Sequence, residues 1–202
     1  MSKIKLGQQV VVSDPCYTIP TWCQSVVDGV KPGLYDSFVK KVDLDDWGVR
    51  CSMLLIVHEN HLNDVLQWEG YSTEIGVDSG QCGIFSSDSY RNDSIVERIG
   101  YGDGDISFFG QSPWSEMGSH KETGERWYHS MCSRTLGKEN WGVYDEGVVT
   151  SSGIGDGCYG LYVAKKGKKI VGLCVDFQVE EEEVIDFDFY KNPEYKNLKT
   201  NI

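Results

Sequence analysis

The sequence predicts a mainly β fold on the border of the α+β class: an antiparallel two-layer domain that resembles a β-sandwich, with one or two covering helices. Apolar residues alternate with a period of two over residues 159–163 and 171–177, as they do in strands. The 202 residues include 23 glycines but only 5 prolines, which is typical of a turn-rich globule. Helical periodicity is confined to short stretches near residues 60–70 and 125–136.

The clearest predicted element is a hairpin closed by the sequence KKGKK at residues 165–169. Four lysines around a glycine cannot enter a core, so this segment is predicted to be a solvated turn. One buried face is predicted to carry Tyr159, Leu161, Val163, Val171, Leu173, Val175 and Phe177. The other face is predicted to pack closely against a second layer, because its residues are mostly small: Cys158, Gly160, Ala164, Gly172 and Cys174, with Tyr162 and Ile170 as larger exceptions.

The N-terminal half is predicted to begin with one strand over residues 3–12, which ends at Asp14-Pro15. An ordered loop over residues 13–33 follows, anchored to the core by Tyr17, Ile19 and Trp22. Next comes a hairpin of residues 34–41 and 49–57, with a buried face made of Val49, Cys51, Met53, Leu55 and Val57. A short helix is then predicted, capped by Asn60, with Leu62, Val65 and Leu66 on one side and its end near Gly70.

The C-terminal half is predicted to contain strands, one clear helix and a tail. Two strand pieces flank a polar turn at residues 78–81, and another strand is expected near residues 106–109. The helix over residues 125–136 has an apolar stripe of Trp127, Tyr128, Met131, Cys132 and Leu136 that should cover one sheet face. An edge strand guarded by charge is predicted at residues 184–189. We therefore expect a single domain over residues 1–190 and a flexible tail over residues 191–202.

The net charge limits the kinds of partner that the protein is expected to bind, and the cysteine content indicates its cellular compartment. The formal net charge is −12, which disfavours binding to nucleic acid and to anionic membranes, although it also suits a DNA mimic with an ordered array of carboxylates. No apolar run has the length of a signal peptide core or a membrane span. The 7 cysteines are interpreted as reduced thiols, so a cytoplasmic location is predicted.

Known cofactor and metal motifs do not match this sequence. Two similar segments, GYGDGD at residue 100 and GIGDGC at residue 153, fit tight glycine turns better than anion-binding nests. Neither has the spacing of a dinucleotide fold or a phosphate loop. The candidate calcium loops DLDDWG and DGDISF lack the glutamate at position twelve, and HENH at residue 58 has the wrong spacing for a zincin. No cofactor and no metal are therefore predicted.

Three short polar segments at strand ends are the candidate binding site. Their side chains could converge on one pocket, although Asp and Ser also cap turns. The candidate binding residues are Asp14, Tyr17, Asp78, Ser79, Gln81, Ser151, Ser152 and Asp156. His129 and Cys132 could form a base and a thiol nucleophile on one helix face, but a buried structural thiol is favoured because Cys132 belongs to the apolar stripe.

Three blocks carry a resemblance to a known family: SDPCYTIP, VDSGQCGIF and VVTSSGIGDGCYGLYVA, followed by GKKIVGLCVDF. In this order they resemble a family of uncharacterised phage and bacterial proteins that is classified as a domain of unknown function. The resemblance implies a phage or bacterial origin, and it implies no activity and no catalytic residue. Residues 86–146 match the family poorly apart from the predicted helix.

Three functions remain open at this point, and the first is favoured. It is a non-enzymatic accessory protein that binds a small, nucleotide-like ligand or a host protein, including a host defence component or its nucleotide signal. The second is a hydrolase with Asp78 or Asp156 as general base and Ser79 or Cys132 as nucleophile. The third is a virion-associated structural subunit that forms a homo-oligomer through flat surfaces.

Overall fold

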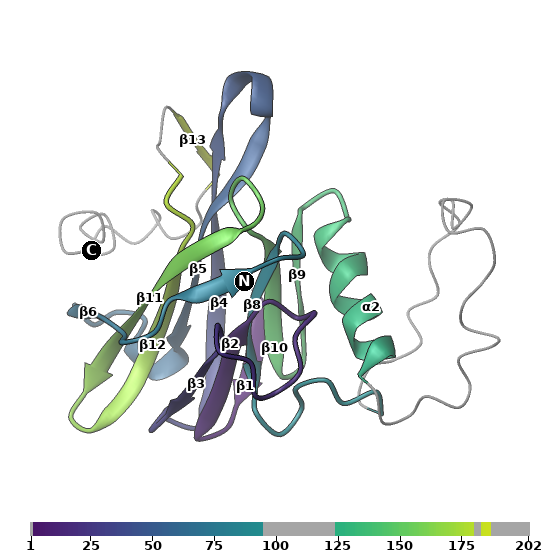
Figure 1. Cartoon of the computed structure of the whole chain (residues 1–202). Helices are drawn as coiled ribbons and strands as arrows, with labels where there is room; N and C mark the ends of the chain where they lie inside the picture. The colour runs from purple at the N-terminus through teal and green to yellow at the C-terminus, as the bar shows by residue number, and fades with distance from the viewer. Residues whose placement is uncertain (1, 95–123, 180–182, 187–202) are drawn as a thin grey trace.

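The computed structural model describes residues 2–94, 124–179 and 183–186. In this part of the chain, two antiparallel β-sheets pack face to face, and helix α2 (Glu125–Thr135) covers the outer side of the smaller sheet (Figure 1). The structure confirms the predicted fold class, a mainly antiparallel β domain with two sandwich-like layers. The first glycine-aspartate segment, the strand near residues 106–109 and the tail at residues 191–202 lie outside the described residues.

The larger sheet has the strand order β1-β4-β5-β12-β11-β6, with β13 paired to β4 and β7 paired to β11. All of these pairings are antiparallel. Its strands are β1 (Ser2–Leu6), β4 (Gly33–Asp43), β5 (Val49–His58), β6 (Trp68–Gly70), β7 (Ile75–Val77), β11 (Gly157–Lys166), β12 (Lys169–Asp176) and β13 (Glu183–Asp186).

The smaller sheet has the order β3-β2-β8-β10-β9, and its pairings are also antiparallel. Its strands are β2 (Gln9–Ser13), β3 (Ser25–Asp28), β8 (Gln81–Ser86), β9 (Trp141–Tyr144) and β10 (Gly147–Ser151). Two short 3-10 turns, η1 (Asp45–Trp47) and η2 (Glu59–His61), follow β4 and β5.

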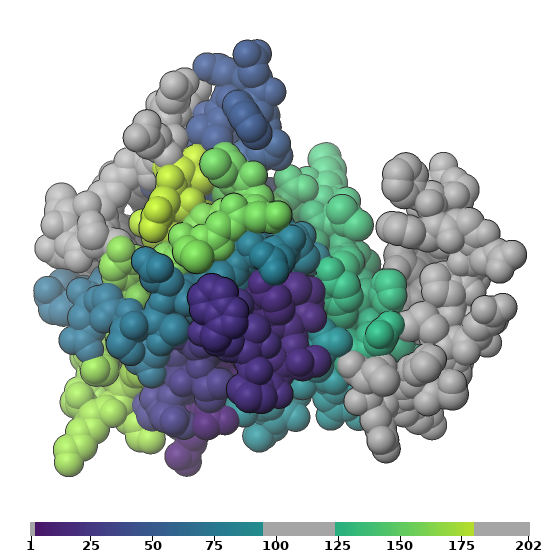
Figure 2. Space-filling view, in the orientation of Figure 1, coloured from purple at the N-terminus to yellow at the C-terminus, as the bar shows by residue number. Residues whose placement is uncertain are grey.

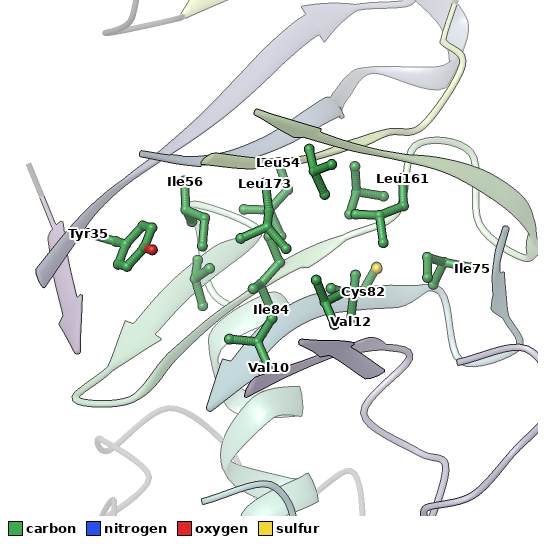
Figure 3. Packing of buried hydrophobic residues seen from close by; sticks show 14 of the residues in the cluster. Val10, Val12, Tyr35, Leu54, Ile56, Ile75, Cys82, Ile84, Leu161 and Leu173 are labelled. Atoms are coloured by element: carbon green, nitrogen blue, oxygen red, sulfur yellow. The ribbon is translucent and has the colours of Figure 1, made fainter. Parts of the chain in front are cut away.

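The main core lies between the two sheets, where alternate residues of each strand point inward (Figure 3). Val10, Val12 and Ile84 come from the smaller sheet, and Leu54 and Leu173 face them from the larger one. All five side chains are fully buried. This layer of aliphatic side chains holds the strand ends in fixed relative positions, and the candidate site is built on those ends.

The hairpin closed by residues 165–169 forms as predicted from β11 and β12, with Leu161 opposite Val175 and Val163 opposite Leu173. One detail of the prediction is wrong: Ile170 packs in the core between the sheets, whereas Val171 packs in a second cluster on the outer face. The reason is a β-bulge, because the pairing passes from Ala164 opposite Gly172 to Lys165 opposite Ile170. A bulge inserts one residue and so reverses the alternation of faces, which a strict period of two cannot show.

The hairpin of β4 and β5 is also confirmed, and it contains a second bulge. Its register shifts between Lys40 and Lys41, so that Cys51 packs between the sheets while Met53 packs on the outer face. The predicted single buried face of β5 is therefore wrong. Both faces of this strand are buried, since the outer cluster of the larger sheet covers the second one.

The N-terminal predictions need two corrections. The predicted strand over residues 3–12 is two strands, β1 in the larger sheet and β2 in the smaller one. The predicted loop over residues 13–33 contains β3, which pairs with β2. Ile19 and Trp22 do not anchor this segment, because their side chains are 46% and 86% exposed. Apolar character alone did not reveal that they point to solvent.

The first predicted helix is absent, and the second one is confirmed. The chain after β5 forms η2, where the His58 side chain accepts a hydrogen bond from the backbone N–H of Asn60, and then β6. Trp68 on β6 is buried above Gly172, where a Cβ atom would lie 2.8 Å from Trp68 Cη2. Burial of this indole on the outer face of the larger sheet outweighs the weak helical pattern.

Helix α2 packs on the outer face of the smaller sheet, as expected. Trp127 and Met131 are fully buried against Phe85 on β8 and Val149 on β10. Leu136, the last residue of the predicted stripe, is instead 80% exposed, because the helix ends at Thr135. No helix among the described residues is long and apolar enough to span a membrane.

Candidate functional site

The candidate site is organised by Asp14, which is fully buried where the chain leaves β2. Its Oδ1 atom accepts hydrogen bonds from the backbone N–H of Cys16 (2.8 Å) and the hydroxyl of Ser79 (2.7 Å). Its Oδ2 atom accepts hydrogen bonds from the backbone N–H groups of Asp78 (2.9 Å) and Ser79 (2.6 Å). One carboxylate therefore ties the segment after β2 to the turn between β7 and β8, 64 residues further along the chain.

The turn between β7 and β8 is also tied to α2. Gly80 has a φ angle of +69°, a conformation that glycine adopts without strain. The side-chain amide of Gln81 donates hydrogen bonds to Ser79 Oγ (3.3 Å) and Cys132 Sγ (3.4 Å). Its carbonyl oxygen accepts a hydrogen bond from Thr135 Oγ1 (2.8 Å). Gln81 thus fixes the last turn of the helix against the site.

Tyr90 and Arg91 also fix the position of the segment after β2. Tyr90 donates a hydrogen bond through its hydroxyl to the backbone carbonyl of Tyr17 (2.7 Å). The guanidinium of Arg91 donates to the carbonyls of Pro15 (2.9 Å) and Cys16 (3.1 Å). Burial, followed by hydrogen bonds with Asp78 and Cys23, raises the pKa of the Tyr17 phenol, so Tyr17 stays neutral at physiological pH.

The third predicted segment joins the same cluster in part. The backbone N–H of Ser152 donates to the carbonyl of Gly80 (3.0 Å), and the Ser152 hydroxyl donates to the carbonyl of Gly155 (2.9 Å). Ser151 is paired with Gln81 in the β10–β8 ladder, but its hydroxyl donates to Cys51 Sγ (3.4 Å) and not to the site. The glycine-aspartate segment forms a turn here, as predicted, with positive φ angles at Gly153 and Gly155.

Asp78 and Asp156 each stand one residue beyond the last pair of β7 and β11. In this antiparallel ladder Val77 is opposite Gly157, so Asp78 follows β7 and Asp156 precedes β11 at the same end of the pair. Both aspartates are exposed, unlike Asp14. The structure therefore brings two carboxylates from distant parts of the sequence to the same edge.

The hydrogen bonds favour a positioning role for Asp14 over acid-base chemistry. Its two oxygens already accept four hydrogen bonds from the protein itself, and a general base needs a free lone pair near the proton that it removes. Burial and the neighbouring Asp14 raise the pKa of the Cys16 thiol to about 12. Burial, with Cys132 beside it, raises the pKa of Tyr128 to about 12. The Cys16 thiol and the Tyr128 phenol therefore remain protonated at neutral pH.

We expect Cys16 to react with iodoacetamide much more slowly than Cys158 at pH 8. The thiolate is the reactive form, and a thiol whose pKa is raised to about 12 contains very little thiolate at that pH. Cys158 is exposed on β11, whereas Cys16 is half-buried. Peptide mapping by mass spectrometry at timed intervals measures both rates. Equal rates, with the folded state verified by circular dichroism, would contradict this arrangement of Cys16 and Asp14.

Several residues of the site were missed by the sequence analysis: Cys16, Gly80, Tyr90, Arg91, Tyr128 and Thr135. Thr135 lies four residues after Met131 on a recognisable helix, so helical spacing offered a signal for it. Tyr90 and Arg91 stand in a segment without periodicity and offered none. In the described part of the chain, no group of three or more His, Cys, Asp or Glu side chains could hold a metal ion.

Comparisons of this chain with protein-family models, curated proteins and solved structures found no match.

Proposed function

We propose that this chain is a non-enzymatic accessory binding protein of phage or bacterial origin, which binds a small ligand or a host protein at the edge formed by residues 14–17, 78–81 and 152–156. The observation that carries the proposal is the use of Asp14. Its carboxylate accepts four hydrogen bonds that hold two loops together, while Asp78 and Asp156 remain exposed next to the last pair of β7 and β11.

This arrangement suits recognition because its frame is formed before a ligand arrives. Hydrogen bonds to Asp14, Gln81 and Tyr90 order the loops in the free protein, so little conformational entropy remains to be lost on binding. The hydrolase alternative gains no support from the same contacts. Ser79 donates its hydroxyl proton to a carboxylate whose acceptor positions are already occupied, which is a structural hydrogen bond.

The double substitution Asp78→Asn and Asp156→Asn is expected to abolish binding without unfolding the protein. It removes both exposed carboxylates, while the backbone N–H of residue 78 can still donate to Asp14. The protein would be purified gently from bacterial cells and analysed by native mass spectrometry, which detects any bound molecule or chain. The matched control is Asp46→Asn with Asp145→Asn, which removes two exposed carboxylates from other loops.

We expect a stoichiometric companion on the wild type and on the control, but not on the Asp78/Asp156 variant. A companion that stays bound to the double variant would refute the site. The binding function itself would be refuted if the wild-type protein carries no companion and, at catalytic enzyme concentrations, hydrolyses a substrate in a screen. That result would support the hydrolase alternative.

A further inference from the structure

Exposed apolar side chains are concentrated around the candidate site. Eight large hydrophobic residues are exposed in the described part of the chain, and four of them stand on segments that contact the β7–β8 turn or its flanking strands. These four are Ile19 (46% exposed), Trp22 (86%), Leu136 (80%) and Ile154 (63%). We call this set, together with Asp78 and Asp156, the edge surface.

Interactions of neighbouring residues place the backbone of each of the four near residues 76–81. Trp22 precedes Cys23, whose carbonyl accepts a hydrogen bond from the N–H of Gly76 (3.0 Å). Leu136 follows Thr135, which is bonded to Gln81, and Ile154 lies two residues after Ser152, which is bonded to Gly80. Ile19 lies two residues after Tyr17, and an interaction with Asp78 contributes to the raised pKa of the Tyr17 phenol.

The figures agree with this placement. The β7–β8 turn, the β10–β11 turn and the end of α2 lie toward the same end of the two-layer body (Figure 1). In Figure 2, purple atoms of the N-terminal strands and loops lie in the middle of the visible face, next to teal and green atoms. Hydrogen bonds from Ser152 to Gly80 and from Thr135 to Gln81 join the segments that carry Ile154 and Leu136 to the β7–β8 turn.

Exposed carboxylates outnumber exposed cations on this surface, where Lys138 is exposed two residues after Leu136. Asp78, Asp156 and Glu74 are all exposed, and Glu74 begins the segment that leads into β7. Arg91 lies close by, but its guanidinium is directed at the carbonyls of Pro15 and Cys16. The whole chain carries a formal net charge of −12, so two copies repel each other and a cationic partner is attracted.

We infer that the edge surface binds a protein segment in which lysine or arginine side chains flank apolar residues. This inference rests on the proposed binding function and specifies its partner. Trp22 supplies a large aromatic anchor of the kind that dominates protein–protein contacts. The exposed carboxylates of Asp78 and Asp156 pair with the cationic side chains and direct their approach, while Leu136 and Ile154 cover the apolar residues between them.

The test uses the full chain and a defined probe, the synthetic peptide Gly-Arg-Leu-Leu-Arg-Gly, titrated into isotope-labelled protein and followed by NMR. We expect the indole N–H signal of Trp22 and the amide signals of Gly80 and Gly155 to shift, and the shifts to shrink at high salt. The indole signal of Trp47, which is 63% exposed at the tip of the β4–β5 hairpin, is the internal control and should not move.

Two protein variants and two altered peptides test which side chains contribute to peptide binding. Trp22→Ala should weaken peptide binding by about tenfold or more, while Trp47→Ala should leave it unchanged. A peptide with glutamate in place of arginine should not bind, and one with serine in place of leucine should bind much more weakly. If the serine peptide binds as tightly as the leucine peptide, the binding depends on non-specific charge attraction alone, and the inference is overturned.

The outcomes separate this inference from the proposed function. If the peptide fails to shift the edge-surface signals, while native mass spectrometry finds a companion that depends on Asp78 and Asp156, the partner class is wrong and the binding site stands. If both fail, the binding function falls as well. Concentration-dependent dimers that Trp22→Ala abolishes would show that a second copy occupies the surface, which also overturns the inference.

Discussion

Replacing Asp14 by alanine is expected to lower the free energy of unfolding by about 3–5 kcal/mol, because three backbone N–H groups and one hydroxyl lose their common acceptor. Asp14 is fully buried, so water cannot replace the carboxylate without opening the two loops. Asp14→Asn should also be destabilising, since its amide group would present a donor to groups that are donors themselves.

Urea denaturation followed by tryptophan fluorescence measures this effect. Asp88→Asn is the matched control, because Asp88 is an exposed aspartate in the loop after β8 and its loss should change the free energy of unfolding by less than about 0.5 kcal/mol. An Asp14→Ala variant that is as stable as the control would contradict the central role of this carboxylate.

Replacing Trp127 by alanine should destabilise the protein by about 3–5 kcal/mol and loosen α2. The indole is fully buried, with ring centroids 4.9 Å from Phe85, 5.0 Å from Tyr90 and 6.3 Å from Tyr144. Met131 is the other fully buried side chain of α2 in this cluster and is smaller than an indole, so removal of Trp127 leaves a large cavity under the helix. The free energy of unfolding and the hydrogen exchange of α2 amides measure the two effects.

The same substitution should also weaken the candidate site, because α2 carries the Thr135 hydroxyl that is bonded to Gln81. Leu136→Ala is the informative comparison. Leu136 is 80% exposed at the end of the same helix, so its loss should leave stability unchanged while it reduces binding at the edge surface. The prediction fails if Leu136→Ala proves as destabilising as Trp127→Ala.

The candidate site shows how far sequence reasoning reaches. Asp14, Asp78, Ser79 and Gln81 were selected because polar residues stand at strand ends, and the structure joins all four by hydrogen bonds. The same reasoning selected Ser151, which the structure directs toward Cys51. Strand ends that meet in space depend on pairing between distant segments, and a local pattern holds no information on that pairing.

The sequence also does not show which role each polar residue has in the site. Asp14 and Asp78 look alike in the sequence, because each stands at the end of a short apolar segment, VVVS before Asp14 and IGV before Asp78. Only the register of the sheets makes Asp14 a buried acceptor and leaves Asp78 exposed beside Asp156. The exposure of Trp22 also depends on the tertiary structure. Its neighbours in space, and not its neighbours in sequence, determine whether a tryptophan in a loop is buried or exposed.

The sequence by itself determined the β class, the β11–β12 and β4–β5 hairpins and helix α2, because each depends on hydrophobic periodicity and turn residues within a short span. The tertiary structure decided which strands share a sheet, where the bulges reverse the faces and that Trp68 lies in a strand. It also decided that one buried carboxylate joins two loops. These features depend on contacts between residues far apart in the chain, whose free energy exceeds that of local preferences.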